Sequence, residues 1–451
     1  MTQPRGSGSD GPVPGAGGIE ARLLAAGLAP LPRTAWLEID LDALRGNLAV
    51  LREAVGPGVS VEPVVKADAY GHGAVPVARI LEAAGARGLS VATLDEAFEL
   101  REAGVALPLL VLYPVPPEGV EAAAWARIAV TLGPGRLGER TLQAAASAAG
   151  KGAPDLEVHL EIETGLGRGG VPAADVVRSV RSLLEADGVA LAGVWTHLAA
   201  ADDAANAHGQ DARFGEAVGR LAGDLGVALG ADGLRRHLAG SGGVLGADVA
   251  RWDAVRTGIA LYGLVPDALA VPASTADLAA GLRPVMALKA RPVRVADLPA
   301  GHGVSYGPSF TTTRPSRIAT LPVGYADGWR RILSDRADAL VRGVRAPVIG
   351  RVAMDAIMVD VTDVPGDPVH EDDEFVLIGE QGDERITAFD LAATGGTISY
   401  EILSAMSRRL PRVYHAAGLP VEILTLAGGR SEWRASSSGT GTSATWRSMP
   451  S

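Results

Sequence analysis

The sequence predicts an α/β protein, a (β/α)8 barrel of the TIM type followed by a mostly β domain. From about residue 36 to residue 265, short apolar runs alternate with stretches of helical spacing rich in Ala, Leu, Arg and Glu. Eight runs joined by helices indicate a barrel, although a doubly wound open sheet has the same periodicity. After residues 275–284 the runs are separated by Gly, Pro and Asp turns with little helix, which indicates β structure.

Each predicted barrel strand is an apolar run of five to nine residues between turn signals. In chain order they are VEPVVKA (61–67), LSVAT (89–93), LLVLYP (109–114), IAVTLG (128–133), LEVHLEIE (156–163), LAGVWTHL (191–198), RRHLAG (235–240) and VRTGIALYG (255–263). Pieces such as AVPVARILEAAGA and AADVVRSVRSLLEADG have helical periodicity and separate them. The last helix expected in the β domain is SYEILSAMSRRLP.

Composition sets the domain boundaries that we expect. Residues 1–33 begin with a Gly/Pro/Ser-rich stretch that reads as a disordered lead, and residues 428–451 read as a low-complexity, disordered tail. Between them we expect the barrel at 34–275 and the β domain at 276–427.

Charge and cysteine content exclude several classes of protein. The 451 residues include 41 basic and 52 acidic side chains, a net charge of −11, which argues against nucleic acid or an anionic membrane as a partner. The absence of cysteine excludes disulfides and thiol catalysis. No apolar stretch is long enough to span a membrane, the N-terminus lacks a signal peptide, and no His/Asp/Glu spacing suggests a metal site. We therefore expect a cytoplasmic protein.

Lys66 is the first candidate for chemistry. The chain has three lysines among its 41 basic residues, so most positions that need only a positive charge carry Arg. Arg cannot lose its proton at ordinary pH, whereas Lys can act as an amine nucleophile, above all when it is buried. Lys151 in AAGKGAP reads as a loop residue, and Lys289 in MALKARPV reads as a strand residue with its charge facing out. Lys66, at the end of a buried run, has no such simple explanation.

Other polar residues fall at the same end of the predicted barrel. Arg168, His197, Ser241 and Arg256 follow or end strands, as Lys66 does. In a (β/α)8 barrel the chemistry lies at the carboxyl ends of the strands. Together with the glycine-rich turns nearby, these residues predict a site for an anionic ligand.

Eight motifs in order give this chain a family resemblance. They are VVKADAYGHGA, ETGLGR, THLAAAD, VRTGIALYGL, GVSYGPSF, LPVGYADGWRR, GRVAMD and TISYE. They resemble the motifs of the alanine racemase family, fold-type III enzymes that use pyridoxal 5′-phosphate (PLP), and the resemblance as a whole covers roughly residues 34 to 426. The resemblance implies a PLP-binding barrel with a β domain, and a cytoplasmic isomerase that interconverts L-alanine and D-alanine for peptidoglycan.

The resemblance also implies two catalytic bases on opposite faces of the cofactor. Lys66 matches the lysine that binds PLP covalently and then serves the D-enantiomer as a base. Tyr306, in VSYG, matches the base for the L-enantiomer, which comes from the partner subunit of a homodimer. Racemisation needs a proton removed on one face and returned on the other, which two such bases provide.

The remaining site residues follow from the same motifs. Arg256 matches the residue that faces the pyridine nitrogen, although outside this motif a structural salt bridge would be the ordinary reading. His197 matches its partner in a network that His237 extends. The phosphate is expected at Tyr70, Ser241, Gly258, Ile259 and Tyr400. Arg168 is expected at the PLP phenolic oxygen and the substrate carboxylate, with Met354 of the partner subunit at that carboxylate and Tyr325 at the substrate entrance.

Three positions depart from the family pattern. Glu161 stands where many members have a carbamylated lysine, Gly240 where Asn precedes the phosphate serine, and Ala353 where Cys or Ser precedes Met354. Glu161 supplies a carboxylate directly, Gly240 loosens a turn, and Ala353 leaves room for larger substrates such as serine or 2-aminobutyrate. A fold-type III decarboxylase and a PLP-carrier protein remain as alternatives, but Arg256 and Tyr306 speak against them.

Overall fold

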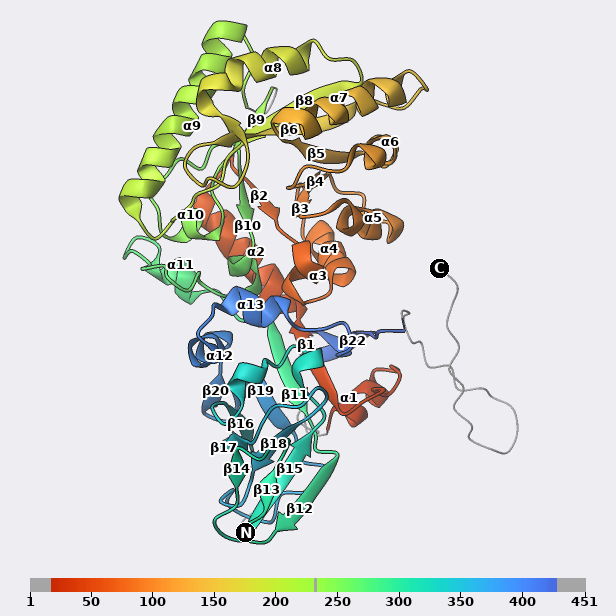
Figure 1. Cartoon of the computed structure of the whole chain (residues 1–451), viewed down its shortest axis with the longest axis vertical. Coiled ribbons are helices and arrows are strands. Elements are labelled where there is room, and N and C mark those ends of the chain that lie inside the picture. Colours follow the sequence, from red (N-terminus) through yellow and green to blue (C-terminus); the bar gives the residue numbers. More distant parts are fainter. Residues whose placement is uncertain (1–17, 231–232, 428–451) are drawn as a thin grey trace, which may run out of the picture. The chain divides into compact units, whose positions relative to one another are not determined.

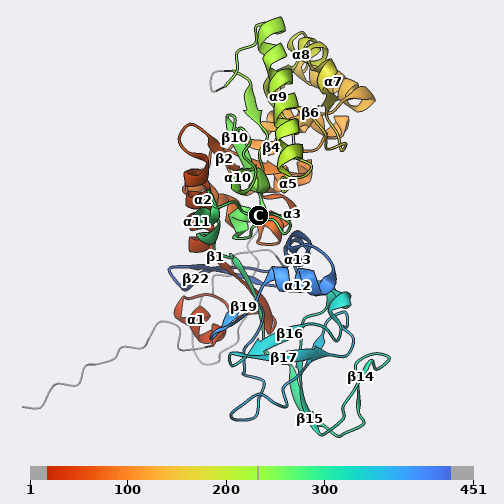
Figure 2. The same cartoon turned by 90° about the vertical axis from the view of Figure 1, so that its left-hand side faces the viewer.

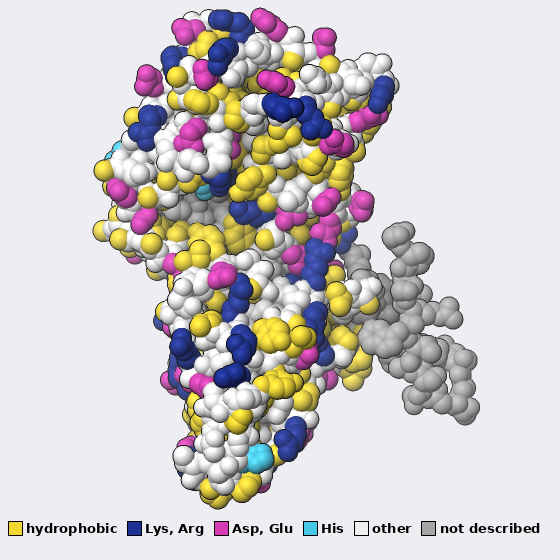
Figure 3. Space-filling model, in the orientation of Figure 1, with side chains coloured by type: hydrophobic (Ala, Val, Ile, Leu, Met, Phe, Trp, Pro, Cys, Tyr) yellow, Lys and Arg dark blue, Asp and Glu magenta, His cyan; other side chains and the backbone are white. Residues whose placement is uncertain are grey.

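A computed structural model describes residues 18–230 and 233–427 of the chain. The chain divides into two compact units. The barrel unit comprises Ala43–Val285 and Thr397–Ser404, and the β unit comprises the described parts of Met1–Asp42, Met286–Gly396 and Ala405–Ser451. The lead and tail expected at 1–17 and 428–451 lie outside the described residues. Figure 3 shows acidic and basic side chains interspersed over one face of the molecule.

The barrel unit is built on eight parallel strands, which confirms the predicted barrel (Figure 1). In spatial order they are β2 (Ser60–Pro63), β10 (Ala254–Thr257), β9 (Arg235–His237), β8 (Val189–Trp195), β6 (Leu156–Glu163), β5 (Ile128–Leu132), β4 (Leu109–Val111) and β3 (Leu89–Val91). A bridge between Val64 and Ser90 joins the two ends of this order. Each strand lies within one of the eight predicted runs or overlaps it. Because the first and last strands meet, the open-sheet alternative is excluded.

Helices surround these strands, as Figures 1 and 2 show. They are α2 (Leu41–Val55), α4 (Ala74–Ala83), α5 (Leu94–Glu102), α6 (Val120–Trp125), α7 (Gly135–Ala149), α8 (Val176–Leu184), α9 (Ala204–Leu225) and α11 (Ala276–Ala280), with one-turn α3 (Lys66–Tyr70), α10 (Ser241–Leu245) and α13 (Ser399–Ser404). In α8 the buried residues Val176, Val180 and Leu183 share one face, as the helical spacing of the sequence predicts. Short β7 (Val171–Pro172) adds to β6.

Polar side chains occupy the interior of the barrel. Register pairs Arg256 with Glu62, and Trp195 with His237, so each pair points to the same side of the sheet. Glu62, His237 and Arg256 are buried there. A barrel core is ordinarily filled by branched apolar residues, so buried ionisable groups at these positions indicate a functional interior.

The β unit contains an eleven-stranded sheet within the described residues. In spatial order it runs β12 (Arg294–Leu298), β15 (Ser316–Leu321), β18 (Ile357–Asp360), β17 (Val344–Ile349), β16 (Asp338–Val341), β19 (Phe375–Gln381), β11 (Met286–Ala290), β1 (Ala35–Asp40), β21 (Arg412–Ala416) and β22 (Leu419–Leu424), with β20 (Glu384–Ile386) beside β19. A separate hairpin joins β13 (Gly303–Val304) to β14 (Phe310–Thr311), and α12 (Ala388–Gly395) follows β20.

The structure differs from the expected boundaries at two places. We expected the barrel to begin at residue 34, but β1 pairs with β11 and β21 in the β unit, because the AWLEID run finds its partners far along the chain. We expected residues 1–33 to be disordered, but Ile19–Ala25 forms helix α1. Its Ile19 and Leu23 are buried against Trp36, Val413 and Ile423, and this apolar contact stabilises the helix.

Lys289 is a further correction, because its charge does not face out. Its Nζ lies 3.2 Å from Glu38 Oε2 and 2.8 Å from Glu374 Oε1, and the side chain is 17% exposed. Two carboxylates compensate the buried ammonium group, which a lone strand pattern could not reveal. Separately, none of the helices in the described ranges is long and apolar enough to cross a membrane.

Candidate active site

Lys66 begins a turn of unusual backbone handedness. β2 ends at Pro63, earlier than the predicted run, and Lys66 opens the short segment α3. Ala67, Asp68, Ala69 and Tyr70 all have φ between 53° and 55°. Left-handed backbone costs a non-glycine residue roughly 1–2 kcal/mol, so four in a row need strong support from their surroundings. Strain of this kind is concentrated at functional sites.

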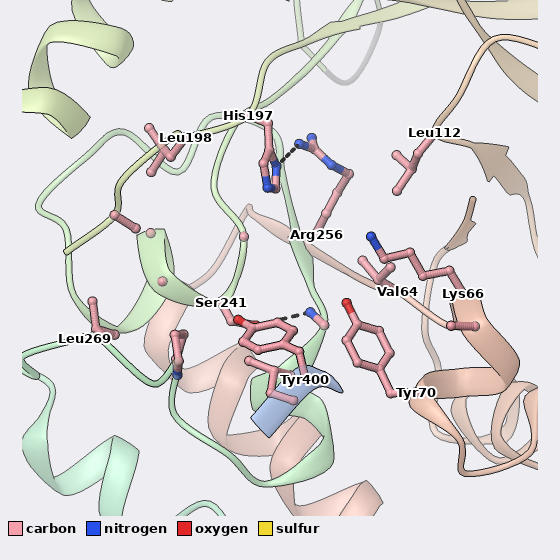
Figure 4. A pocket seen from close by; sticks show the side chains of 18 of the residues that line it. Val64, Lys66, Tyr70, Leu112, His197, Leu198, Ser241, Arg256, Leu269 and Tyr400 are labelled. Carbon is pink, nitrogen blue, oxygen red and sulfur yellow. Dashed lines mark hydrogen bonds between the residues drawn. The ribbon is translucent and has the colours of Figure 1, made fainter. Parts of the chain in front are cut away.

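One cavity of about 480 Å³ in the barrel unit gathers the predicted cofactor site. All nine residues predicted to bind the cofactor line it: Lys66, Tyr70, Arg168, His197, Ser241, Arg256, Gly258, Ile259 and Tyr400. They come from strand ends and turns far apart in the sequence. Figure 4 shows the guanidinium of Arg256 directed at His197, the amine of Lys66 on the Arg256 side of the cavity, and Tyr70 and Tyr400 below them.

The electrostatics of this cavity favour a neutral amine at Lys66. Burial lowers the pKa of the Lys66 ammonium, and the nearby cations Arg168 and Arg256 lower it further. The carboxylate of Glu96 acts in the opposite direction. A lowered pKa makes the free amine available as a nucleophile and a base at lower pH than for an exposed lysine.

Ser241 and the turn at Gly258 form a polar cradle on another wall. Ser241 Oγ accepts hydrogen bonds from the backbone N–H groups of Gly258 at 3.1 Å and Ala260 at 3.2 Å. A Cβ atom at position 258 would overlap the Tyr70 hydroxyl, so glycine lets that hydroxyl approach the backbone. The pKa of Tyr70 is raised by burial, and burial raises that of Tyr400 to about 12, so both hydroxyls remain protonated donors.

Arg256 is fixed from several sides. Its Nη2 donates to the Thr196 carbonyl at 2.8 Å, and its Nη1 donates to the carbonyl and to Nδ1 of His237. Its guanidinium lies 4.6 Å from the centre of the Trp195 ring, and its Nη2 lies 3.5 Å from His197 Nδ1. Burial lowers the pKa of Arg256 to about 10, so the group stays charged at neutral pH.

The histidines around Arg256 are therefore neutral acceptors. Burial, followed by the charge of Arg256, lowers the pKa of His197 to about 3 and holds that of His237 well below its usual range. Because a guanidinium can only donate, His237 Nδ1 must accept, and its proton sits on Nε2. The network predicted for His197 and His237 is thus brought together around one arginine.

His159 belongs to the same network and was missed by the sequence reasoning. Its Nδ1 lies 2.9 Å from His237 Nε2, so it accepts the His237 proton. Burial lowers its pKa to about 3. The period of two along LEVHLEIE places His159 on the same strand face as Glu161, and that signal would have found it.

Arg168 lies at the rim of the cavity with a carboxylate and an aromatic ring beside it. Its Nη2 is 3.3 Å from Glu161 Oε1, and its guanidinium lies 5.5 Å from the centre of the Tyr113 ring. Burial raises the pKa of Glu161, and the charge of Arg168 opposes that shift. Glu161 thus pairs with Arg168 directly, as a carboxylate at this position was expected to do although it is shorter than a carbamylated lysine.

The predicted residues of the β unit are exposed, Tyr306 and Met354 on loops and Tyr325 at the start of a 3-10 helical turn (Tyr325–Asp327). Tyr306 is 75% exposed and sits between Ser305 and Gly307, which both have positive φ. Tyr325 and Met354 are also exposed, at 43% and 51%. Tyr325 N–H donates to the Ala353 carbonyl at 3.0 Å, so these two loops are held together.

The side chains of the cavity fit the cofactor that the motifs predict. The cavity offers an amine of lowered pKa, a serine cradle with a tyrosine hydroxyl, and two guanidinium groups. The amine suits an aldehyde, the serine cradle with its tyrosine hydroxyl suits a phosphate, and the guanidinium groups suit a phenolate or a carboxylate. The donor set therefore suits PLP.

Comparisons with known proteins agree with this chemistry. Residues 39–266 match the family model described as alanine racemase, N-terminal domain, and residues 285–414 match alanine racemase, C-terminal domain. An alanine racemase of Symbiobacterium thermophilum is 44% identical over 385 residues, 85% of this chain and 97% of that protein.

Solved structures give the same result. The crystal structure of alanine racemase from Bacillus anthracis with bound L-Ala-P matches with a TM-score of 0.79 at 34% identity, covering 88% of this chain and 99% of that one. Alanine racemase from Bartonella henselae with covalently bound pyridoxal phosphate matches with a TM-score of 0.71 at 28% identity, covering 85% and 100%. With both family domains matched in order, this chain belongs to the alanine racemase family.

Proposed function

We propose that this protein interconverts L-alanine and D-alanine with PLP bound at Lys66. The observation that supports this most directly is the gathering of all nine predicted cofactor residues around one cavity, into which an amine of lowered pKa points. Bound PLP supplies an electron sink that acidifies the Cα–H bond of an amino acid attached to it. The product D-alanine would supply peptidoglycan synthesis in the cytoplasm.

The chain's own residues divide the remaining work. Lys66 holds the cofactor, and its freed amine takes or returns the Cα proton on one face. Arg168 binds the substrate carboxylate, and its pairing with Glu161 at 3.3 Å keeps it oriented. Arg256 stays protonated at neutral pH, since its pKa of about 10 lies above neutrality, and it would face the ring nitrogen of the bound cofactor.

Tyr306 is the proposed base for the opposite face, supplied by the partner subunit of a homodimer. The side chain is 75% exposed on the β unit, and Met354 and Tyr325 are exposed as well. Exposed aromatic and apolar side chains of this kind suit a contact with a second copy of the chain. A monomer should then be almost inactive, and activity should follow the dimer fraction on dilution; full activity in a monomer would refute the shared site.

The experiment that tests the function combines cofactor binding with turnover. The purified protein is incubated with PLP, its visible absorbance is recorded, and D-alanine formed from L-alanine is followed by chiral separation. Lys66→Ala should lose both the bound-cofactor absorbance and the racemisation, whereas Tyr306→Phe should lose racemisation and keep the absorbance. Lys151→Ala is the matched control, because Lys151 is exposed and pairs with Glu121 at 2.7 Å.

Either failure would change the proposal. Bound PLP without turnover on alanine would direct attention to other amino acids. A Lys66→Ala variant that keeps both the bound-cofactor absorbance and the racemisation would refute the role of Lys66.

A further inference from the structure

The left-handed turn after Lys66 needs an anchor that its own residues do not explain. Four consecutive non-glycine residues, Ala67 to Tyr70, have φ near 53°. The turn delivers both Lys66 and Tyr70 to the same cavity. Hydrogen bonds from Gly71 N–H to the Ala67 carbonyl and from Ala74 N–H to Asp68 Oδ1 close its far end. Ala and Tyr have no intrinsic preference for this conformation. At the near end Ala69 N–H donates to the Val65 carbonyl at 2.9 Å, and a further contact reaches Ala67 N–H from outside the turn.

Glu96 makes that outside contact. Its Oε1 accepts a hydrogen bond from Ala67 N–H at 2.6 Å. Its Oε2 accepts from Ala92 N–H at 2.7 Å and Thr93 N–H at 3.1 Å. Glu96 is the third residue of α5, where it completes a capping box with Thr93. The capping box needs one of its oxygens, and the second is committed to the turn beside Lys66.

Short bonds to an ionised acceptor are the strong kind. Three N–H donors converge on one carboxylate, and each gains from its negative charge. A glutamine in the same place would keep one acceptor oxygen but direct an NH2 group at N–H donors. One of the two anchors would then be lost, and the strain of the turn would be released.

We infer that Glu96 is a positioning residue for Lys66, because it clamps the strained turn that aims Lys66 and Tyr70 into the cavity. It contacts neither the cofactor cradle nor the substrate arginine, and apart from the effect of its charge on the pKa of Lys66 it acts through the backbone at Ala67. The effect on turnover that we expect rests on the proposed function. The effect on amide hydrogen exchange rests on the backbone geometry alone.

The test compares Glu96→Gln with Asp95→Asn. Asp95 is exposed, lies in the same first turn of α5 and carries the same charge. Amide hydrogen exchange of residues 67–73, PLP affinity from visible absorbance, and kcat and KM for alanine are measured for each. In Glu96→Gln we expect about ten-fold faster exchange in that segment, about ten-fold weaker PLP binding and a fall in kcat with little change in KM, since a hydrogen bond to a charged group is lost. Asp95→Asn should stay within about two-fold of the unaltered protein in each measurement, because surface changes have small effects.

Rescue by glycine separates the clamp from a simple charge effect. Glycine adopts positive φ without a steric penalty, so Ala67→Gly in the Glu96→Gln background should restore exchange protection and kcat to within about three-fold. If the double variant stays as impaired as Glu96→Gln, the carboxylate acts through its charge and the clamp is wrong. Equal exchange in Glu96→Gln and Asp95→Asn would also overturn it.

Two further outcomes keep the test decisive. If Glu96→Gln does not fold, Ala67→Gly alone should slow exchange across the turn, and faster exchange would overturn the inference. If the unaltered protein binds PLP but does not racemise alanine, the proposed function fails. The exchange and PLP-affinity measurements would then still decide whether Glu96 holds the turn.

Discussion

Arg168 Nη2 lies 3.3 Å from Glu161 Oε1, so a carboxylate built into β6 faces the guanidinium at the cavity rim. The carboxylate is mostly buried, whereas the arginine side chain is 37% exposed. Solvent therefore screens part of this attraction. The pair holds Arg168 in one orientation without any added group.

Glu161→Gln should weaken substrate binding. Loss of the charged partner leaves Arg168 less ordered, and we expect kcat/KM for alanine to fall about five-fold, near 1 kcal/mol after screening. The change should appear mainly in KM, because Arg168 is proposed to bind the carboxylate in both ground and transition states. Glu157→Gln, an exposed position on the same strand, is the control.

The pH dependence of Glu161→Gln tests the same pair. Burial raises the pKa of Glu161, so in the unaltered protein the carboxylate takes up its proton at a higher pH than an ordinary glutamate. The ion pair is then lost as pH falls through that raised pKa, and kcat/KM should decline on this acid side. The variant should lack this limb, and an unchanged acid profile would exclude Glu161 as its origin.

Gly193→Ala should disturb the histidine network under Arg256. A Cβ atom at this position would lie 2.6 Å from His159 Nδ1 and 2.7 Å from the Arg235 carbonyl oxygen. The carbonyl belongs to β9 and cannot move without the strand, so both the His159 ring and this strand must shift. We expect a loss of about 1–3 kcal/mol in the free energy of unfolding, measured by urea denaturation, together with weaker PLP binding.

Gly219→Ala provides the contrast within the same unit. It lies in α9, and a Cβ there meets nothing within 4 Å. Alanine at an exposed helix position should stabilise the protein by about 0.5–1 kcal/mol. Equal effects of the two substitutions would show that the space beside His159 is not limiting.

The barrel could be predicted from sequence because its information is local. Each strand is a short apolar run, and the polar residues that follow it reach the same end of the barrel whatever the details of packing. Lys66, His197 and Arg256 could be placed in one site on that basis.

The left-handed turn could not be predicted in the same way. Nothing in KADAY favours positive φ, and the contact that supports it comes from Glu96 on α5, beyond the intervening helix α4 and strand β3. In the same way, β1 belongs to the β unit because it pairs with β11 near residue 288 and with β21 near residue 413. Pairings over such separations are a property of the folded chain and leave no mark on the local pattern.

Glu38→Gln should destabilise the β unit in a pH-dependent way. Burial alone would raise the pKa of Glu38, but Lys289, Arg22 and His415 outweigh it and lower the pKa from its usual 4.5 to about 2. A depressed carboxylate pKa contributes stability above pH 4.5 that is lost as pH falls toward 2. The contribution at neutral pH is on the order of 3 kcal/mol.

Urea unfolding of Glu38→Gln and the unaltered protein between pH 7 and pH 3 measures this contribution. The difference between them should be largest at pH 7 and shrink as the pH approaches 3. Glu380→Gln, an exposed position on β19, should show no such trend. A difference that is constant with pH would mean that Glu38 acts by packing instead of by charge.

Gly240→Ala and Gly242→Ala should have opposite effects although they flank the same serine. Gly240 has φ of −96°, and a Cβ there would meet its nearest neighbours, the Arg256 carbonyl and His197 Cε1, at 3.5 and 3.7 Å. Alanine therefore fits, and it should stabilise the protein by about 0.4–1 kcal/mol by restricting the unfolded chain. A better-ordered turn before Ser241 should also bind PLP more tightly.

At Gly242 the same addition meets a fixed neighbour. Its Cβ would lie 2.7 Å from the Ala201 Cβ, and neither group can rotate away. We expect a loss of about 1–3 kcal/mol and weaker PLP binding, measured by urea denaturation and by absorbance titration. Gly240→Ala could instead weaken PLP binding as much as Gly242→Ala. In that case PLP binding would require the backbone freedom of glycine at position 240, and the departure from the family's Asn would not be a simple loosening of the turn.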